Sequence, residues 1–453
     1  MSIQSHPDAG ERSRRYGLRE GAFYAVMQGG GETYLSAFAV FLHATTFQIG
    51  LLSALPQLVG TWAQLLSVKV MTRVEHRKAL ILAGAGGQAL AWLPILALPL
   101  LFPVSGPWLL IACAVLYFAM GHFATPAWNS LMADLVDPNG RGSYFSHRSR
   151  IIALCSFAAL CLAGLILHGA ETWGYSVAGF VVIFVLAAAA RIISTRQLAQ
   201  VEELVPPPTR GAPFSLLGYV CDPHNTDLRR FLLFSTLMHA AVLVAGPYFV
   251  VYMLRDLRLS YLDYTAWMAM QLFGQLISLR RWGKIADRFG NKKVLVVTGL
   301  TVPFLPMLYL VSQNLVFMTV VNFLGGIIWA GLTLGLQNYV FDIVAPKDRA
   351  KGVAVMNSLN AIGWFAGALL GSWMAVWAPS VVSVAGYTLS LASNLPVVFF
   401  ISGLLRLVVS LSLLRTFREG RSVESITHRQ LVLELPLIKP LAAAFSGRIV
   451  RQP

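Results

Sequence analysis

The chain has 453 residues, of which 56% are hydrophobic and only 12% are charged. An ordinary soluble domain carries about 25% charged residues, and a single hydrophobic core stops growing near roughly 250–300 residues. The composition therefore excludes a disordered chain, a coiled coil, a collagen-like chain and almost any cytosolic enzyme, and it indicates a polytopic membrane protein.

Twelve apolar segments are each long enough to cross a bilayer as a helix, which takes about 20 residues. In the first half of the chain, the predicted helices cover residues 21–43, 47–68, 79–102, 107–132, 149–169 and 173–195. In the second half, they cover residues 230–253, 262–282, 293–312, 316–340, 352–377 and 393–414. The predicted fold class is an all-α polytopic membrane protein with twelve transmembrane helices.

The formal charge is +15, from 35 Lys and Arg against 20 Asp and Glu. All but two of the basic residues lie in the N-terminus, in alternate connections, in the C-terminal tail or near adjoining helix ends; the exceptions are Arg255 and Arg258. Basic loops stay on the cytoplasmic side, so both termini are predicted to be cytoplasmic. The predicted location of the protein is the inner (cytoplasmic) membrane of the cell. Arg191 and Arg406, near helix ends, are expected to snorkel toward the interface.

The longest interior break contains Pro206, Pro207 and Pro208 and cannot stay in lipid. It divides the chain into a cytoplasmic N-terminal segment (1–20), a six-helix bundle (21–195), a cytoplasmic linker (196–229), a second six-helix bundle (230–414) and a basic cytoplasmic tail (415–453). The tail either is loosely ordered or rests on anionic lipids.

The two halves repeat each other at corresponding helix ends. The stretch Gly283-x-x-x-Asp287-Arg288-x-Gly290-x-Lys292-Lys293 aligns with residues 68–78 at a shift of 215 positions, and the same shift carries Arg191 onto Arg406. Residues 134–141 and 342–349 share the pattern Asp-x-Val-x-Pro-x-x-Arg at a shift of 208. Several matches in the same order indicate duplicated halves.

With twelve spans and this repeat, the chain resembles the major facilitator superfamily of secondary transporters over about residues 18–415. Residues 283–293 look like the superfamily's signature loop between the second and third helices of a half. The first-half copy is degraded, because Val68, Thr72 and Glu75 replace its glycines and its aspartate.

The resemblance implies a conformational gate at this loop, made by Gly283, Asp287, Arg288 and Gly290. A carboxylate at a helix end can accept hydrogen bonds from the free N–H groups of a neighbouring helix N-terminus. In the superfamily, the partner of Asp287 would be the start of the fifth helix. For the basic residues of the loop, plain positive-inside topology is the competing interpretation.

Glu32 is the only acidic residue deep within a predicted helix. An intramembrane carboxylate is costly and is a functional hypothesis by default. Glu32 could couple proton movement to transport, or it could be a protonated side chain that makes one structural hydrogen bond. The glycines at positions 29–31 weaken the helix or let another helix approach closely.

The resemblance places helices 1, 4, 7 and 10 around a central cavity. The predicted cavity residues are Glu32, Gln28, Tyr34, His122, His239, Gln337 and Asn338. For each histidine, a structural hydrogen bond between helices is the competing interpretation. Because these residues carry few fixed charges, the solute is expected to be neutral or weakly charged.

The sequence therefore predicts a secondary active transporter that moves a small solute by alternating access, with proton coupling through Glu32 as the leading hypothesis. The competing class is a transporter-like sensor or scaffold that binds a solute without moving it. We find no metal-ligand spacing, nucleotide loop or nucleophile–base pair within a span, so we predict no enzyme, no cofactor and no metal site. The expected partners are the solute, protons and anionic lipids, with no nucleic acid, and the protein is expected to be a monomer.

Overall fold

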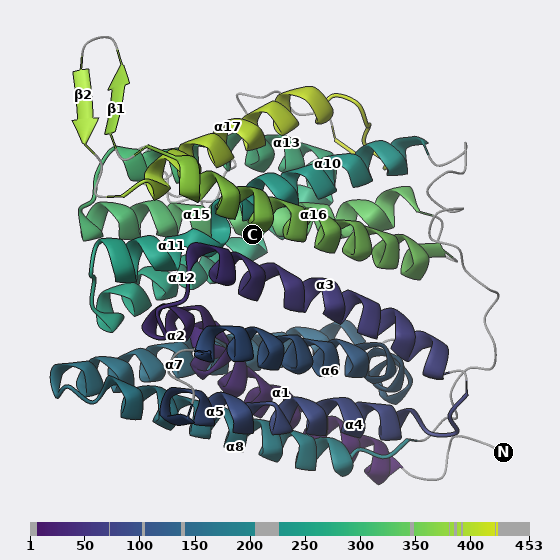
Figure 1. The fold of residues 1–453 in the computed structure, drawn as a ribbon. Coiled ribbons are helices and arrows are strands. Elements are labelled where there is room, and N and C mark those ends of the chain that lie inside the picture. The colour runs from purple at the N-terminus through teal and green to yellow at the C-terminus, as the bar shows by residue number, and fades with distance from the viewer. Residues whose placement is uncertain are drawn as a thin grey trace, which may run out of the picture. The chain divides into compact units, whose positions relative to one another are not determined.

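The computed structural model describes residues 7–71, 73–101, 105–136, 141–203, 226–344, 348–379, 381–384, 387–390, 393–421 and 423–424. These residues are helical apart from turns and one short hairpin (Figure 1), which confirms the all-α prediction. Most of the predicted linker and of the basic tail lies outside the described residues.

Each of the six spans predicted for the first half corresponds to one helix or to a broken helix. The unbroken helices are α3 (Thr46–Met71), α6 (Gly106–Leu135), α7 (Arg141–Thr172) and α8 (Ser176–Ala199). The first span is broken into α1 (Pro7–Gly30), the 3-10 helix η2 (Glu32–Tyr34) and α2 (Leu35–Phe41), and the third is broken into α4 (Arg77–Leu90) and α5 (Trp92–Leu101).

The second half has the same plan. Its unbroken helices are α12 (Tyr261–Phe289), α15 (Leu315–Ile343), α16 (Arg349–Trp377) and α17 (Leu395–Leu413). The seventh span comprises α10 (Thr226–Leu243), η4 (Gly246–Tyr248), α11 (Phe249–Val251) and the π-helix η5 (Tyr252–Asp256). The ninth comprises α13 (Asn291–Thr301), α14 (Phe304–Met307) and η6 (Leu308–Leu310). An antiparallel hairpin that was not predicted, β1 (Val381–Val384) with β2 (Tyr387–Ser390), lies between α16 and α17.

Ten segments of the described chain are long and apolar enough to cross a membrane. The first span, which breaks after Gly30, and α12, which ends in a cluster of charged residues, are not among them. Large apolar side chains are also widely exposed; Trp62 and Trp173 are 70% and 79% exposed. Such exposure is unusual for a soluble monomer and suits contact with acyl chains, so the fold is that of a multi-pass membrane protein.

Contacts between residues group the chain into two compact units. Unit 1 contains residues 1–213, 246–266 and 364–377, and unit 2 contains residues 214–245, 267–363 and 378–453. Two short parts of the second half therefore group with the first half. The predicted limits of the linker and of the two bundles stay a prediction.

The α1 helix ends where its glycines meet a crowded interface in unit 1. A Cβ atom at Gly29 would lie 2.1 Å from the carbonyl oxygen of Ser156 on α7, and one at Gly31 would lie 2.5 Å from the Cβ atom of Ala187 on α8. Since glycine is also a weak helix former, the α-helix gives way to a 3-10 turn at Glu32. Both roles expected of these glycines, close packing and a helix break, are therefore present.

Candidate functional site: buried polar groups along the first half

The Glu32 carboxylate is held at the break after α1. Its Oε2 atom accepts a hydrogen bond from the Tyr117 hydroxyl at 2.7 Å, and the Gln28 side chain, one turn earlier, also hydrogen-bonds it. Tyr117 is fully buried on α6, and its ring packs edge-on against Trp92, with centroids 5.3 Å apart. The structure therefore brings together Glu32 and Gln28 of the predicted set, and it adds Tyr117.

Tyr117 was not among the predicted cavity residues, although the sequence holds a signal for it. Tyr117, Gly121, Thr125 and Trp128 recur at spacings of three and four residues, which places them on one face of α6. Tyr117 is the polar member of that face nearest to Glu32. A search for polar residues with helical spacing would have included it.

Tyr34 lies only two residues from Glu32 but has different partners. Its hydroxyl donates to the Leu160 carbonyl oxygen at 2.9 Å and lies 2.7 Å from the Thr265 hydroxyl. Thr265 is packed tightly against α7, because a Cβ atom at Gly164 would lie 2.2 Å from the Thr265 hydroxyl oxygen. Tyr34 thus bridges η2, α7 and the start of α12 within unit 1, apart from the Glu32 contacts.

The other predicted cavity residues are divided between the two units. In unit 1, the His122 Nε2 atom lies 3.2 Å from Gln57 Oε1 of α3, a contact between helices. In unit 2, the His239 Nδ1 atom lies 2.8 Å from the Ser235 carbonyl oxygen of its own helix. The α15 pair is also in unit 2; there Gln337 is exposed and Asn338 is half-buried.

The predicted gate residues in unit 2 have different surroundings. Gly290 has φ 92°, and a Cβ atom there would lie 2.0 Å from the Glu419 carboxylate, so the turn before α13 requires glycine. Asp287 is exposed, and the exposed Arg288 pairs with Glu424 at 2.8 Å. A Cβ atom at Gly283 would meet nothing within 4 Å. The predicted contact between Asp287 and the start of the fifth helix stays a prediction.

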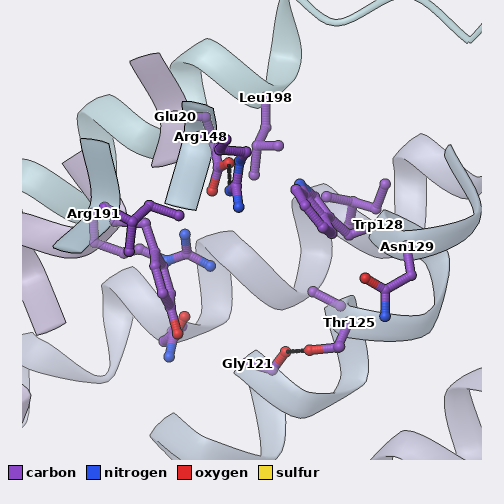
Figure 2. A pocket seen from close by; sticks show the side chains of 13 residues that line it. Glu20, Gly121, Thr125, Trp128, Asn129, Arg148, Arg191 and Leu198 are labelled. Atoms are coloured by element: carbon purple, nitrogen blue, oxygen red, sulfur yellow. Dashed lines mark hydrogen bonds and ion pairs between the residues drawn. The ribbon is translucent and has the colours of Figure 1, made fainter. Parts of the chain in front are cut away.

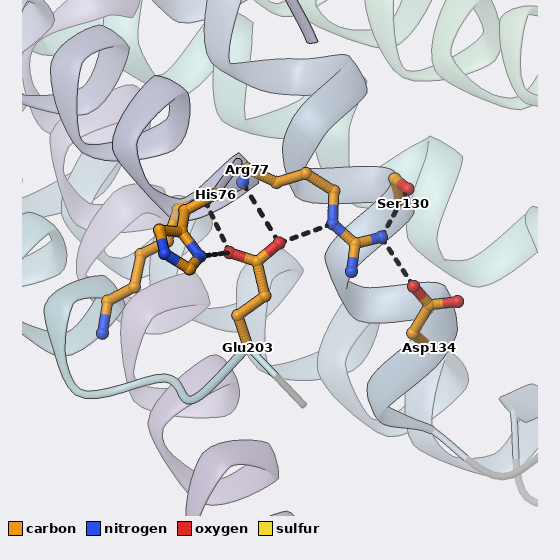
Figure 3. A network of polar contacts seen from close by, with 6 residues as sticks. His76, Arg77, Ser130, Asp134 and Glu203 are labelled. Carbon is orange, nitrogen blue, oxygen red and sulfur yellow. Dashed lines mark hydrogen bonds and ion pairs between the residues drawn. The ribbon is translucent and has the colours of Figure 1, made fainter. Parts of the chain in front are cut away.

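The degraded copy of the loop, in unit 1, carries a denser network (Figure 3). Arg77, at the start of α4, is fully buried. Its Nε atom donates to Glu203 Oε1 at 2.8 Å, and its Nη1 atom donates to Asp134 Oδ2 at 2.6 Å and to the Ser130 hydroxyl at 2.8 Å. Glu203 also accepts hydrogen bonds from the backbone N–H groups of Arg77 and Lys78, so it caps α4.

Burial alone would raise the pKa of Glu203, but the hydrogen bonds and charge of Arg77, together with the capping N–H groups, hold that pKa below its ordinary value. Glu203 follows α8 and is separated from Arg77 by more than a hundred residues. Neither residue was predicted as a site residue. The repeat had flagged Arg77 and Asp134 only as matched positions.

A cavity of about 200 Å3, lined by both apolar and polar side chains, lies among α1, α4, α6, α7 and α8 in unit 1 (Figure 2). Arg148 Nη2 donates to Glu20 Oε2 at 2.7 Å on its wall. Arg191 approaches from α8, with its guanidinium carbon 5.1 Å from the centre of the Tyr24 ring. Glu20, Tyr24 and Gln28 follow one another at four-residue spacing on α1, so the cavity and the Glu32 cluster lie along one face of that helix.

The snorkelling expected of the two repeated arginines is wrong. Arg191 is 4% exposed and Arg406 is 3% exposed. Arg191 donates from Nη1 to the Ser194 hydroxyl at 3.0 Å, and Arg406 lies 3.4 Å from the carbonyl oxygens of Val302 and Val242. Both side chains point into the packed interior of their own unit, where they contact aromatic rings or polar groups, rather than toward a helix end.

Comparisons with known proteins agree on the fold. The sequence profile of the Major Facilitator Superfamily matches residues 22–245 and 231–450. A search of curated protein sequences gave no match.

Among solved structures, the chain is similar to the D-xylose–proton symporter (TM-score 0.66, 12% identity, covering 92% of this chain and 99% of that one). It is similar to the nucleoside transporter NupG (0.61, 13%, 91% and 99%). It is also similar to a bacterial homologue of the iron transporter ferroportin (0.66, 13%, 91% and 99%). At these identities, the likeness shows the fold alone.

Proposed function

Because the chain belongs to the Major Facilitator Superfamily, we propose that it moves a small solute across the inner membrane by alternating access, and that Glu32 couples this movement to protons. Two six-helix halves would rock about a site near the membrane midplane. The observation that carries the proposal is the Glu32 cluster at the break after α1. The positive-inside pattern supports cytoplasmic termini.

The chemistry of the cluster suits a carboxyl group that changes its protonation state. An ionised Glu32 accepts from the Tyr117 hydroxyl at 2.7 Å. A protonated Glu32 can donate instead, because the hydroxyl and amide beside it accept as well as donate. A site that satisfies both forms lets proton binding proceed without stranding a buried polar group.

The position of Glu32 gives its protonation a route to movement. It begins a 3-10 turn, while Tyr34 at the other end of the same turn is bound to α7 and α12. A change at Glu32 therefore acts on a short, weakly helical segment tied at one end. Such a segment can shift more easily than a continuous helix. We propose that this turn transmits proton binding to the rest of unit 1.

The test uses proteoliposomes containing the purified full-length protein and an internal pH-sensitive dye. A panel of D-xylose, nucleosides and small carboxylates is added outside, and solute-dependent proton entry is recorded. We expect at least one solute to move protons in the wild type. Glu32→Gln should abolish gradient-driven accumulation while it retains exchange of labelled solute, because a carboxamide cannot titrate.

Glu11→Gln is the matched control, since Glu11 is an exposed carboxylate on α1, the helix before Glu32, and is paired with Arg15. Unchanged gradient-driven accumulation in Glu32→Gln would remove the coupling role. Solute binding without any flux in the wild type would contradict transport itself and leave a sensor or scaffold. We further propose that the protein works as a monomer and that anionic lipids contact its basic ends.

A further inference from the structure

The cavity of about 200 Å3 in unit 1 has a net positive wall. Two arginines and one glutamate line it. Glu20 pairs with Arg148 at 2.7 Å, so these two charges offset each other. Among the described residues, no carboxylate lies within ion-pair distance of Arg191. Glu32 acts on Arg191 only at longer range, so one buried guanidinium charge is left over whenever Glu32 is protonated. Inside a membrane protein, an unbalanced charge is costly.

The cavity also holds polar atoms that lack partners. Among the described residues, Arg191 Nε, Trp128 Nε1 and Gln88 Oε1 are buried and have no hydrogen-bond partner. Arg191 and Gln88 are 4% and 3% exposed, and all three residues line the cavity. Buried polar groups are nearly always satisfied. Two donors and one acceptor around one space therefore point to a polar occupant.

Trp128 and Arg148 form a further part of the wall. The Arg148 guanidinium lies 4.4 Å from the centre of the Trp128 ring and is also bound to Glu20, so its position is fixed from two sides. Thr125 and Asn129, on α6, also line the cavity and are exposed (Figure 2).

The size of the cavity narrows the kind of occupant. Drug-sized ligands need roughly 300–1,000 Å3, whereas a cavity of about 150 Å3 holds benzene, with its six heavy atoms. A space of about 200 Å3 therefore suits a molecule of roughly six to eight heavy atoms. Its charge should be −1, to balance Arg191 in the state in which Glu32 is protonated.

We propose that this cavity binds a small monocarboxylate, whose carboxylate group accepts hydrogen bonds from Arg191 Nε and Trp128 Nε1. A guanidinium–carboxylate contact is among the strongest hydrogen-bonded pairs. A hydroxyl group on the same molecule would satisfy Gln88 Oε1. Binding is a property of unit 1 and can be measured without transport, so it stands or falls separately from the transport cycle.

Arg406 provides the matched control, since the repeat places it at the position equivalent to Arg191. It is as deeply buried as Arg191, and its Nε atom likewise has no hydrogen-bond partner among the described residues. Arg406 is not among the residues that line the cavity, however, and its terminal nitrogens lie 3.4 Å from two backbone carbonyl oxygens. Loss of Arg406 therefore reproduces the general cost of removing a buried arginine. Of the two arginines, only Arg191 should affect ligand binding when it is replaced.

The experiment titrates purified full-length protein in detergent with sodium L-lactate, a monoanion of suitable size, at constant ionic strength. Calorimetry gives the affinity, and thermal unfolding gives an independent readout. L-Lactamide, of the same shape but neutral, and the inorganic anions chloride and sulfate are the comparators. We expect saturable binding of lactate, with a raised Tm, and no comparable effect of the other three.

Arg191→Gln should weaken lactate binding by about tenfold to a hundredfold, because it removes a charged donor. Trp128→Phe keeps the ring but removes one neutral donor, and it should weaken binding by about threefold to tenfold. Arg406→Gln should bind as the wild type does. If Arg191→Gln does not fold, Trp128→Phe decides the question.

Several results would overturn the proposal. They are the absence of saturable lactate binding to the wild type, equal binding of lactamide, an equal Tm increase with chloride or sulfate, and wild-type affinity in Trp128→Phe. The first of these would leave ordered water as the occupant of the cavity. None of them bears on proton-coupled flux through Glu32.

Discussion

The starts of α4 and α13 occupy equivalent places in the two halves, and both are capped by a carboxylate that follows the last helix of their half. Glu203 accepts from the Arg77 backbone N–H at 3.1 Å, and Glu419 accepts from the Lys292 backbone N–H at 3.0 Å. The side chains at these positions then differ. Arg77 binds two acids, whereas Lys292 contacts the Leu414 carbonyl oxygen and lies over the Phe417 ring.

The acid at the end of the fourth helix of each half is bound in both cases, but by different groups. Asp134 is bound by Arg77 at 2.6 Å. Its counterpart Asp342 is bound by Asn291 at 2.6 Å and by Arg421 at 3.1 Å. In the first half, a single arginine binds this acid, whereas in the second half two residues share that role. Arginine suits the first arrangement because it can bind two acceptors in fixed directions.

This difference shows that a well-formed loop motif and a dense network need not coincide. The second half retains Gly290 with its positive φ, and its Arg288 is exposed, as is the matched Arg73 of the first half. The first half has lost the motif's glycines and aspartate, yet Arg77, which matches Lys292, is fully buried between two acids. We therefore expect the stability of the first half to depend more strongly on a single side chain than the stability of the second half does.

The largest expected effect is that of Arg77→Gln. Removing one member of a buried ion-paired group costs about 3–5 kcal/mol, because the remaining charges are left without a partner. Asn291→Ala, the matched change in the second half, should cost about 1–3 kcal/mol, because Asp342 keeps Arg421. The free energy of unfolding in detergent measures both. Equal losses would contradict the difference between the halves.

The next effect concerns the turn before α13. Gly290→Ala forces a side chain into φ 92° and places its Cβ atom 2.0 Å from the Glu419 carboxylate. We expect a loss of about 1–3 kcal/mol from backbone strain, and more if Glu419 gives up its cap of α13. Thermal unfolding checks the size of the loss. Full stability in Gly290→Ala would mean that the turn adopts another conformation.

A smaller effect should appear in the pH dependence of stability. The pKa of Glu203 is lowered in the folded protein, so its contribution is present at neutral pH, above the unfolded pKa. That contribution is lost as the pH falls through the folded pKa, below the ordinary value near 4.5. Glu203→Gln should be less stable at neutral pH, and the difference from the wild type should shrink in acid. A stability difference that stays constant with pH would contradict a stabilising role for the ionised Glu203 carboxylate.

The all-α fold could be predicted from the sequence because apolar length alone indicates where helices can cross a membrane. The site could be predicted only in part. Glu32 stands out because a carboxylate in an apolar run is costly, but its partner Tyr117 lies 85 residues away, and no local pattern pairs them. Arg191 was expected at the interface because its stem can snorkel, whereas packing around Tyr24 and Ser194 holds it inside.

The smallest expected effect is that of Gly283→Ala, and it has the opposite sign. Gly283 lies within α12, and a Cβ atom there would meet nothing within 4 Å. Because alanine is the better helix former, we expect about 0.5–1 kcal/mol of added stability.

The superfamily motif instead assigns this glycine to the gate, where another conformation of the protein would bring a helix against it. Transport and thermal unfolding of the same variant separate the two explanations. Added stability with unchanged flux leaves Gly283 without a role in the gate, whereas added stability with lost flux would mean that the cycle passes through a state in which α12 is packed at this point.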